Sequence, residues 1–236
     1  MARDNPPGGS IWTRPERSAR GPVPEYSRAE ITAAAIALAD SAGLAAVTMR
    51  SVAAAIETGP ASLYRYVATR GELLELMADQ ARGELVYDET RSDEPAVRLL
   101  ALAREGRATY LRHPWLLDIP AAPIPGPNAI AFIEHALAAL AGTDLPGPAK
   151  LETIGLFSGA VRLLVQTEIE QQQAGQDAAQ WQSELTAYLS QIAAAGQHPH
   201  LAAVLADAPS ADAAQSQDDW FEHAMARILA GLLPPH

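Results

Sequence analysis

The stretch TMRSVAAAIETGPASLYRY, residues 48–66, constrains the fold more than any other part of the chain. Val52 and Ile56 are one helical turn apart in its first half, and Leu63 and Val67 repeat that spacing in and just beyond its second half. Apolar residues at this spacing predict two short helices, each with one buried face. In a pair of helices joined by a tight turn, the second helix can enter the major groove of B-DNA, where base edges are distinguishable.

The helix boundaries in this stretch follow from its polar and conformationally special residues. Thr48 can cap the first helix, and the segment Glu57-Thr58-Gly59 interrupts the apolar period. Pro60 suits the first turn of the second helix, because its missing N–H would have no intrahelical partner there. Three side chains of the second helix are then expected to project away from its buried face: Ser62, Arg65 and Tyr66.

The composition predicts an all-α protein. Helix-forming Ala, Leu, Glu, Gln and Arg dominate the 236 residues, and no run alternates apolar and polar residues as a strand does. The absence of cysteine excludes disulfides, thiolate metal sites and cysteine nucleophiles, and is compatible with a reducing cytoplasm. No apolar run approaches the roughly 20 residues that span a bilayer, and the N-terminus lacks an apolar signal segment. We therefore expect a cytoplasmic protein without membrane contact.

The charge is distributed unevenly along the chain. The net charge of −11 at first argues against a nucleic-acid partner, since DNA binding depends on phosphate neutralisation by Lys and Arg. However, residues 1–70 hold eight arginines against six carboxylates, a net charge of +2, so the whole acidic excess lies in residues 71–236. The acidic part should be repelled by DNA, which leaves the N-terminal part free to dock.

Residues 1–24 are predicted to form a flexible arm. They contain five Pro, three Gly and four Arg, a composition that cannot bury a core. Arg14, Arg17 and Arg20 can lie along phosphates or enter the minor groove, as basic arms of other helix-turn-helix proteins do. The alternative is a leader that makes no contact with DNA.

Two capping signals frame the predicted helix-turn-helix. Ser27 followed by Glu30 is the pattern of a capping box and opens a first helix that Gly43 ends. Thr69 followed by Glu72 repeats the pattern and opens a helix that leads into the rest of the chain.

Four segments, YSRAEITAAAIALADSAG, VTMRSVAAAI, TGPASLYRYV and TRGELLELM, stand in this order within residues 25–85. In them the chain resembles the tetracycline-repressor (TetR) family of transcriptional regulators. The resemblance implies a three-helix helix-turn-helix DNA-binding domain at 25–70, a connecting helix at 70–86, and a helical ligand-binding and dimerisation domain at 87–236. It also implies a homodimer that binds a palindromic double-stranded operator and leaves it when a small-molecule effector binds. A further segment, HPWLLDIPAAPIPGPNAI, looks like one common in actinobacterial members.

The same resemblance implies the DNA contacts, position by position. The base-edge contacts are Pro60, Ala61, Ser62, Arg65 and Tyr66. The phosphate contacts are Thr48, Tyr64 and Arg70, with Arg50 as a further candidate. An arginine such as Arg65 can bind guanine through two hydrogen bonds, and a methyl group such as that of Ala61 can contact thymine. The alternative for Tyr64 and for Tyr66 is a place in the hydrophobic core.

The turn departs from the family pattern. Many members have Gly where Glu57 stands, and a non-glycine residue in a left-handed conformation is strained. Either Glu57 accepts that strain or Gly59 supplies the flexibility of the turn.

The remainder of the chain is predicted to be a series of amphipathic helices. Pro95 opens one that ends at His113-Pro114, and the proline-rich run WLLDIPAAPIPGPN cannot continue it. That run is expected to cover apolar surface as a wall or gate of a pocket. Asn128 is expected to cap the next helix, which ends at Gly142. Further helices are predicted at 148–173, 181–195, just after His198, and 218–233. By the resemblance, the first and last of these pair with their mates in a four-helix dimer interface.

A ligand site is predicted from composition, because this part of the chain is poor in aromatic residues and pockets combine apolar walls with a few polar anchors. The candidates are its larger aromatic or polar-tipped side chains: Arg104, Tyr110, Trp115, Phe132, His135, Phe157, Arg162, Gln166, Trp181 and Tyr188. For each of them ordinary core packing is the alternative.

No cofactor, metal site or catalytic residue is predicted. His198 and His200 flank Pro199, but no further ligand stands at a suitable spacing. No Gly-rich phosphate loop, Gly-x-Ser-x-Gly or HExxH motif occurs, so the sequence does not favour an enzyme. The alternative to a DNA-binding regulator is a small-molecule-binding or scaffold protein of the same fold that no longer reads DNA, which the net charge favours slightly.

Overall fold

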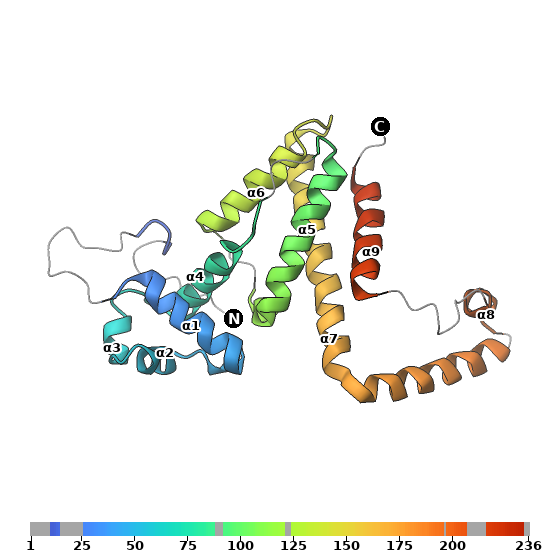
Figure 1. The fold of residues 1–236 in the computed structure, drawn as a ribbon, viewed down its shortest axis with the longest axis horizontal. Helices are drawn as coiled ribbons and strands as arrows, with labels where there is room; N and C mark the ends of the chain where they lie inside the picture. The colour runs from blue at the N-terminus through green and yellow to red at the C-terminus, as the bar shows by residue number, and fades with distance from the viewer. Residues whose placement is uncertain are drawn as a thin grey trace.

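The computed structural model describes residues 10–14, 26–87, 92–120, 124–195, 197–206 and 216–233, apart from the side chains of 174–182. Every regular element in this described part is helical, which confirms the all-α prediction. Helices α1 to α4 form a small unit, here called the head, and helices α5 to α9 form a larger one, the body (Figure 1). No helix in these residues is long and apolar enough to cross a bilayer.

The head begins where the sequence signals place it. Helix α1 (Arg28–Ala42) opens with the predicted capping box between Ser27 and Glu30, and Gly43 ends it with a φ of 77°. After a 3₁₀ turn, η1 (Leu44–Ala46), helix α2 (Met49–Ala55) is capped by Thr48. Helix α3 (Pro60–Leu63) starts on Pro60 as predicted, but it is only four residues long.

Helix α4 (Arg70–Arg82) closes the head, and its cap differs from the predicted capping box. Thr69 accepts the backbone N–H of Glu72 at 3.1 Å, which is the first half of the box. The Glu72 carboxylate does not return to Thr69; it accepts the N–H of Ala68 at 2.7 Å instead, and also binds Arg14. The reciprocal half of the prediction is therefore wrong, because an arginine from far along the chain draws the carboxylate away.

The body packs α5 (Pro95–Arg112), α7 and α9 (Gln217–Leu232) side by side around one apolar core (Figure 1). Leu99, Phe157 and Met225 are among its fully enclosed side chains. As predicted, α5 ends at His113 and does not continue into the proline-rich run, whose first residues form a 3₁₀ turn, η2 (Pro114–Asp118). Helix α6 (Pro127–Ala139) starts with Gly126 in the cap position, so the prediction that Asn128 caps it is wrong: Pro127 already occupies the first helical position.

Helix α7 runs unbroken from Gly147 to Ala194 and corrects the prediction of two helices at 148–173 and 181–195. The polar run between them contains no proline, and its Ala and Gln residues are good helix formers. One internal glycine costs only about 1 kcal/mol relative to alanine, so it need not end a long helix. The helix bends partway along its length, and the short helix α8 (Pro199–Ala206) lies near its far end (Figure 1).

A segment of the body completes the core of the head. Trp115, Leu116 and Ile119 belong to the same buried cluster as the apolar side chains of α1 to α4. Trp115 donates its indole N–H to the Asp40 carboxylate of α1 at 2.6 Å. The His113 ring lies between Asp40 at 2.7 Å and Glu84 at 3.2 Å. The two units are therefore joined by buried polar and apolar contacts at this point.

Candidate DNA-reading surface and effector pocket

The turn that presents helix α3 is held by local backbone geometry. Glu57 adopts a φ of 56°, so of the two alternatives for this turn, Glu57 carries the left-handed conformation. Gly59 has a φ of −83°, which any residue tolerates. Tyr26 donates its hydroxyl to the carbonyl of Ile56 at 3.0 Å and ties the turn to the start of α1. The backbone of Glu57 and the bond from Tyr26 thus hold the turn that orients α3 relative to α2.

The residues expected to meet DNA are exposed or half-buried, with one exception. Those that are exposed are Thr48, Arg50, Pro60, Ala61, Tyr64, Arg65 and Arg70, and Ser62 is half-buried. Tyr66 is only 8% exposed and packs in the head core, which corrects the expectation that it projects outward. It stands three positions after Leu63, and residues at this spacing share one face of a helical turn. For Tyr64 the alternative of core packing fails, because 53% of its surface is exposed.

Arg70 is anchored beside the start of α2. Its Nε donates to the carbonyl of Val47 at 2.8 Å and its Nη2 to that of Leu44 at 3.0 Å. A guanidinium has five N–H donors, so these two bonds leave others to meet a phosphate. Because the carbonyls belong to residues just before Thr48, the two expected phosphate contacts Thr48 and Arg70 are neighbours.

A cavity of about 410 Å³ lies where α4 of the head meets α5, α6, η2 and α7 of the body. Its size falls in the range of small-molecule pockets, roughly 300 to 1,000 Å³. Three of the ligand candidates line it: Tyr110, Phe132 and Phe157. The proline-rich run contributes Ile119, Pro120 and Pro125 to its wall, as expected for a segment that covers apolar surface.

The other ligand candidates have different roles in the structure. Arg104 pairs with Glu222 across α5 and α9, and Gln166 is exposed and bonds Glu170 at 2.9 Å. Trp115 is buried in the head core, and His135 stacks on Tyr87 with ring centroids 3.8 Å apart. Arg162 donates to the carbonyls of Leu116 and Leu117, so it fixes the backbone of η2. Tyr188 is 59% exposed, and the side chain of Trp181 lies outside the described part.

The sequence analysis missed the polar residues that α4 brings to this cavity. Glu75 and Asp79, one turn apart, both line it. Burial raises the pKa of the Glu75 carboxyl, and the nearby charge of Glu72 raises it further. Asp79 accepts the backbone N–H groups of Asn128 at 3.2 Å and Ala129 at 3.0 Å, so it holds the start of α6 against α4. The spacing of Glu75 and Asp79 on one face of an amphipathic helix was the available signal.

Trp12 also lines the cavity, although it belongs to the predicted N-terminal arm and was not among the ligand candidates. Ile11 beside it is only 1% exposed. The prediction of an arm that buries nothing is therefore wrong at residues 10–14, while residues 1–9 and 15–24 lie outside the described residues. A neighbouring isoleucine and tryptophan within a run of Pro, Gly and Arg were the signal for a docked segment.

A cluster of charged side chains connects the body helices α5, α7 and α9. Arg107 of α5 makes two bonds to Glu168 of α7, at 2.7 and 2.8 Å, and one to Asp218 of α9, at 2.7 Å. Its guanidinium also lies 5.2 Å from the ring centre of Phe221. Hydrogen bonding to Glu168 raises the pKa of Arg107, so the guanidinium stays charged. This cluster shapes the body and does not line the cavity.

His198 and His200, which the sequence analysis considered as metal ligands, are both exposed at the start of α8. Within the described ranges no group of three or more His, Cys, Asp or Glu side chains comes close enough together to hold a metal ion.

Family models match both units of the chain. The model described as "Bacterial regulatory proteins, tetR family" matches residues 31–77. The model described as "Tetracyclin repressor-like, C-terminal domain" matches residues 91–234. The two matches fall on the head and on the body, respectively.

Relatives and solved structures agree with these models. The HTH-type transcriptional repressor DrrR1 of Streptomyces coeruleorubidus is 34% identical over 94% of this chain and 83% of its own length. An HTH-type transcriptional regulator of Saccharopolyspora erythraea is 33% identical over 56% of each chain. The crystal structure of the TetR family protein ActR of Streptomyces coelicolor in complex with actinorhodin is 27% identical, with a TM-score of 0.74 over 89% of this chain and 96% of that one.

An exposed α3 face, an arginine anchored at the start of α2 and a cavity lined by α4 thus occur in a chain whose two units both match the same family. The chain belongs to the TetR family of DNA-binding transcriptional regulators.

Proposed function

We propose that the protein is a repressor that binds a palindromic operator as a homodimer and leaves it when an effector occupies the cavity. One observation carries the proposal: α4 takes part in both sites. Its first residue, Arg70, is an expected phosphate contact held beside the start of α2, and Glu75, Ala78 and Asp79 line the cavity. A ligand that binds one placement of α4 better than the other shifts the equilibrium by that difference in affinity.

The effector that fits this cavity is a mainly apolar molecule with rings and a few polar substituents. Phe132, Phe157 and Tyr110 offer aromatic surface, and Glu75 and Ser158 are among the polar groups of the wall. Burial keeps the Glu75 carboxyl easier to protonate than usual, so it can donate a hydrogen bond as well as accept one. Actinorhodin, which is bound in the structure of ActR, is a suitable first probe.

The homodimer is proposed on the exposed leucines of α7. Leu156 and Leu163 are seven residues apart and so share a face, and they are 54% and 63% exposed. Two-fold pairing of α7 and α9 with their mates would cover this face and set the distance between the two α3 helices. An operator-binding protein must reach DNA, so we propose the cytoplasm as its place of action.

The dimer is tested by sedimentation of Leu163→Glu. The wild type is expected at twice the 25 kDa mass of the chain, and the variant at 25 kDa with operator binding largely lost. Val204→Glu on α8 is the matched control, since Val204 is 68% exposed and lies on another helix. A wild type that sediments as a 25 kDa species at micromolar concentration would contradict the dimer.

The operator is found by selection of bound DNA from a random pool, and the readers are then tested on it. Arg65→Ala should cost about 1 to 3 kcal/mol and relax the preference at one base position. Arg70→Ala should weaken all sequences alike and reduce the salt dependence by about one phosphate contact. Lys150→Ala, in the body, is the control. Equal binding of an operator panel by wild type and Arg65→Ala would refute the assignment, and a pool with no enriched sequence would favour the alternative of a binding protein that no longer reads DNA.

A further inference from the structure

Residues Ser10–Arg14, here called the N-terminal latch, form a compact turn on the head. The backbone N–H groups of Thr13 and Arg14 donate to the carbonyl of Ser10 at 3.1 and 3.2 Å. The Ser10 hydroxyl accepts the N–H of Trp12 at 3.3 Å. With Ile11 almost completely buried, the turn is seated in the head and not merely laid over it.

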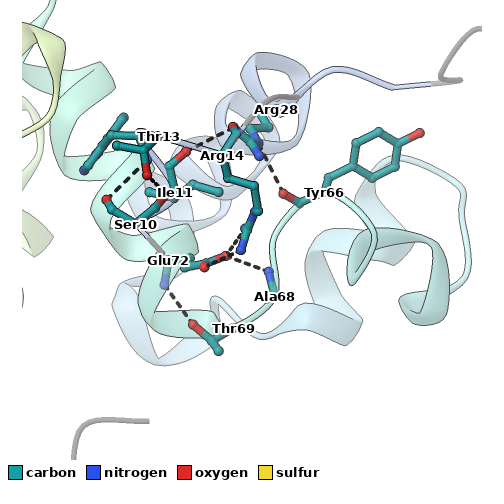
Figure 2. A network of polar contacts seen from close by, with 10 residues as sticks. Ser10, Ile11, Thr13, Arg14, Arg28, Tyr66, Ala68, Thr69 and Glu72 are labelled. Carbon is teal, nitrogen blue, oxygen red and sulfur yellow. Dashed lines mark hydrogen bonds and ion pairs between the residues drawn. The ribbon is translucent and has the colours of Figure 1, made fainter. Parts of the chain in front are cut away.

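One side of the latch is connected to residues 66–68, the segment that follows helix α3. Arg14 donates to both oxygens of Glu72, at 3.0 and 2.6 Å, and the same carboxylate accepts the N–H of Ala68 (Figure 2). Arg28 donates to the carbonyls of Ile11 and Arg14 at 3.2 and 3.0 Å (Figure 2). Its Nε donates to the carbonyl of Tyr66 at 3.2 Å. Arg14 and Arg28 thus connect the latch to residues 66–68, which leave α3.

The other side of the latch reaches the cavity through Trp12. The Trp12 ring lies against Gly126, where an added Cβ atom would meet the Asp79 carboxylate and would come within 2.7 Å of the Trp12 Cζ2, so this position has room only for glycine. The indole Nε1 is buried and has no hydrogen-bond partner in the described structure. A buried N–H without a partner is costly, and an acceptor on a bound molecule would remove that cost.

We propose that Trp12 is an effector contact, whose indole N–H donates to a carbonyl or hydroxyl oxygen of the effector, and that the docked latch withholds Arg14 from DNA. The proposal rests on the proposed effector-controlled repressor and names a contact and a route of regulation within it. Docking of the latch should lower the affinity for DNA, because Arg14 can pair with the Glu72 carboxylate or with a phosphate, but not with both through the same N–H groups. An effector that binds Trp12 stabilises the docked latch, and the docked latch keeps Arg14 on Glu72.

The first experiment needs no effector. Trp12→Ala removes the side chain that reaches the cavity, so the latch should dock less and Arg14 should become available to DNA. We expect operator affinity to rise about threefold to tenfold and the slope of log affinity against log salt to steepen by about one phosphate contact. Adding Arg14→Gln should abolish both changes. Lys150→Ala, in the body, is the control and should behave as the wild type.

Ile11→Ala is a second route to the same state, because it removes most of the side chain that is buried when the latch is docked. It should reproduce the effect of Trp12→Ala on the salt slope while Trp12 itself is kept. Circular dichroism of each variant shows whether the helices are intact. Unchanged affinity and slope in folded Trp12→Ala and Ile11→Ala would overturn the proposal.

The second experiment tests the contact itself with actinorhodin as the probe. Trp12→Phe keeps an aromatic ring and loses the N–H, so probe affinity should fall about tenfold, while operator affinity without probe changes little. Equal probe affinity of wild type and Trp12→Phe would overturn the contact. If the wild type does not bind actinorhodin, the comparison of salt slopes alone decides. Failure of the proposed function looks different, because the wild type itself would then enrich no sequence from a random pool.

Discussion

The ion pair between Arg107 and Glu168 allows the sharpest prediction about what holds the body together. Glu168 is 2% exposed and receives two hydrogen bonds from Arg107. Arg107→Met keeps the apolar stem of the side chain, but it leaves a buried carboxylate without its cation. Removing one partner of a buried pair costs about 3 to 5 kcal/mol. Gln172 also donates to Glu168, at 3.3 Å, which places the expected loss toward the lower end.

The magnitude is measured by urea unfolding, followed by far-ultraviolet circular dichroism at one fixed protomer concentration. The concentration has to be fixed, because dissociation of a dimer makes the free energy of unfolding depend on it. Asp218→Asn is the matched control: Asp218 also binds Arg107, but its side chain is 78% exposed. Such a solvated pair contributes about 0 to 1 kcal/mol, so this variant should unfold almost as the wild type does.

A second variant separates the loss of charge pairing from the loss of packing. Arg107→Met combined with Glu168→Leu removes both charges and leaves apolar groups of similar volume. Replacement of a buried pair in this way is often close to neutral, so the double variant should recover most of the loss. A single variant that loses less than about 1 kcal/mol, or a double variant that is no more stable than the single one, would refute the reasoning.

Three further predictions concern single positions. Glu57→Gly relieves the left-handed strain of about 1 to 2 kcal/mol, while the greater freedom of glycine in the unfolded chain costs up to about 1 kcal/mol of stability. Urea unfolding should therefore show no loss of stability. A clear destabilisation would mean that the Glu57 side chain is needed. Glu75→Gln should raise the stability of the protein at neutral pH. The pKa of the Glu75 carboxyl is raised in the folded protein, so the wild type loses stability as the pH rises through that pKa, and glutamine, which does not titrate, avoids this loss. The difference should shrink as the pH falls toward 4, and a difference independent of pH would exclude this cause. His113→Leu leaves the Asp40 and Glu84 carboxylates without the ring between them and should cost about 1 to 3 kcal/mol. Thermal unfolding measures this loss, and an unchanged midpoint would show that the contact is replaced.

The sequence was most informative where the structure depends on neighbouring residues. Ser27, Thr48 and Pro60 each mark a helix start through a contact within three positions or through a fixed backbone angle, and all three predictions are confirmed. The length of α7 was not predictable in the same way. A polar run rich in Gln is typical of the solvated end of a helix, but only tertiary packing decides whether the helix stops there.

The pocket shows the opposite situation, because distant segments build it. Phe132 and Phe157 were found through their size, but the composition of the body cannot distinguish a wall residue from a core residue such as Trp115. Glu75 belongs to the helix that leaves the head, and Trp12 to the arm before it, so neither was sought among body residues. The ligand candidates were all taken from the predicted body, but the cavity is lined by side chains from both sides of the predicted domain boundary.

The burial of Trp115, Leu116 and Ile119 in the head has a consequence for transplanting this regulator's parts. A DNA-binding unit cut after residue 87 would expose the apolar surface that these three side chains cover. A chimaera that joins this head to the sensor of a relative must therefore also carry residues 113–119, or supply apolar side chains of matching shape at the same place. The portable unit is discontinuous in the chain, and it includes the segment whose carbonyls Arg162 holds from α7.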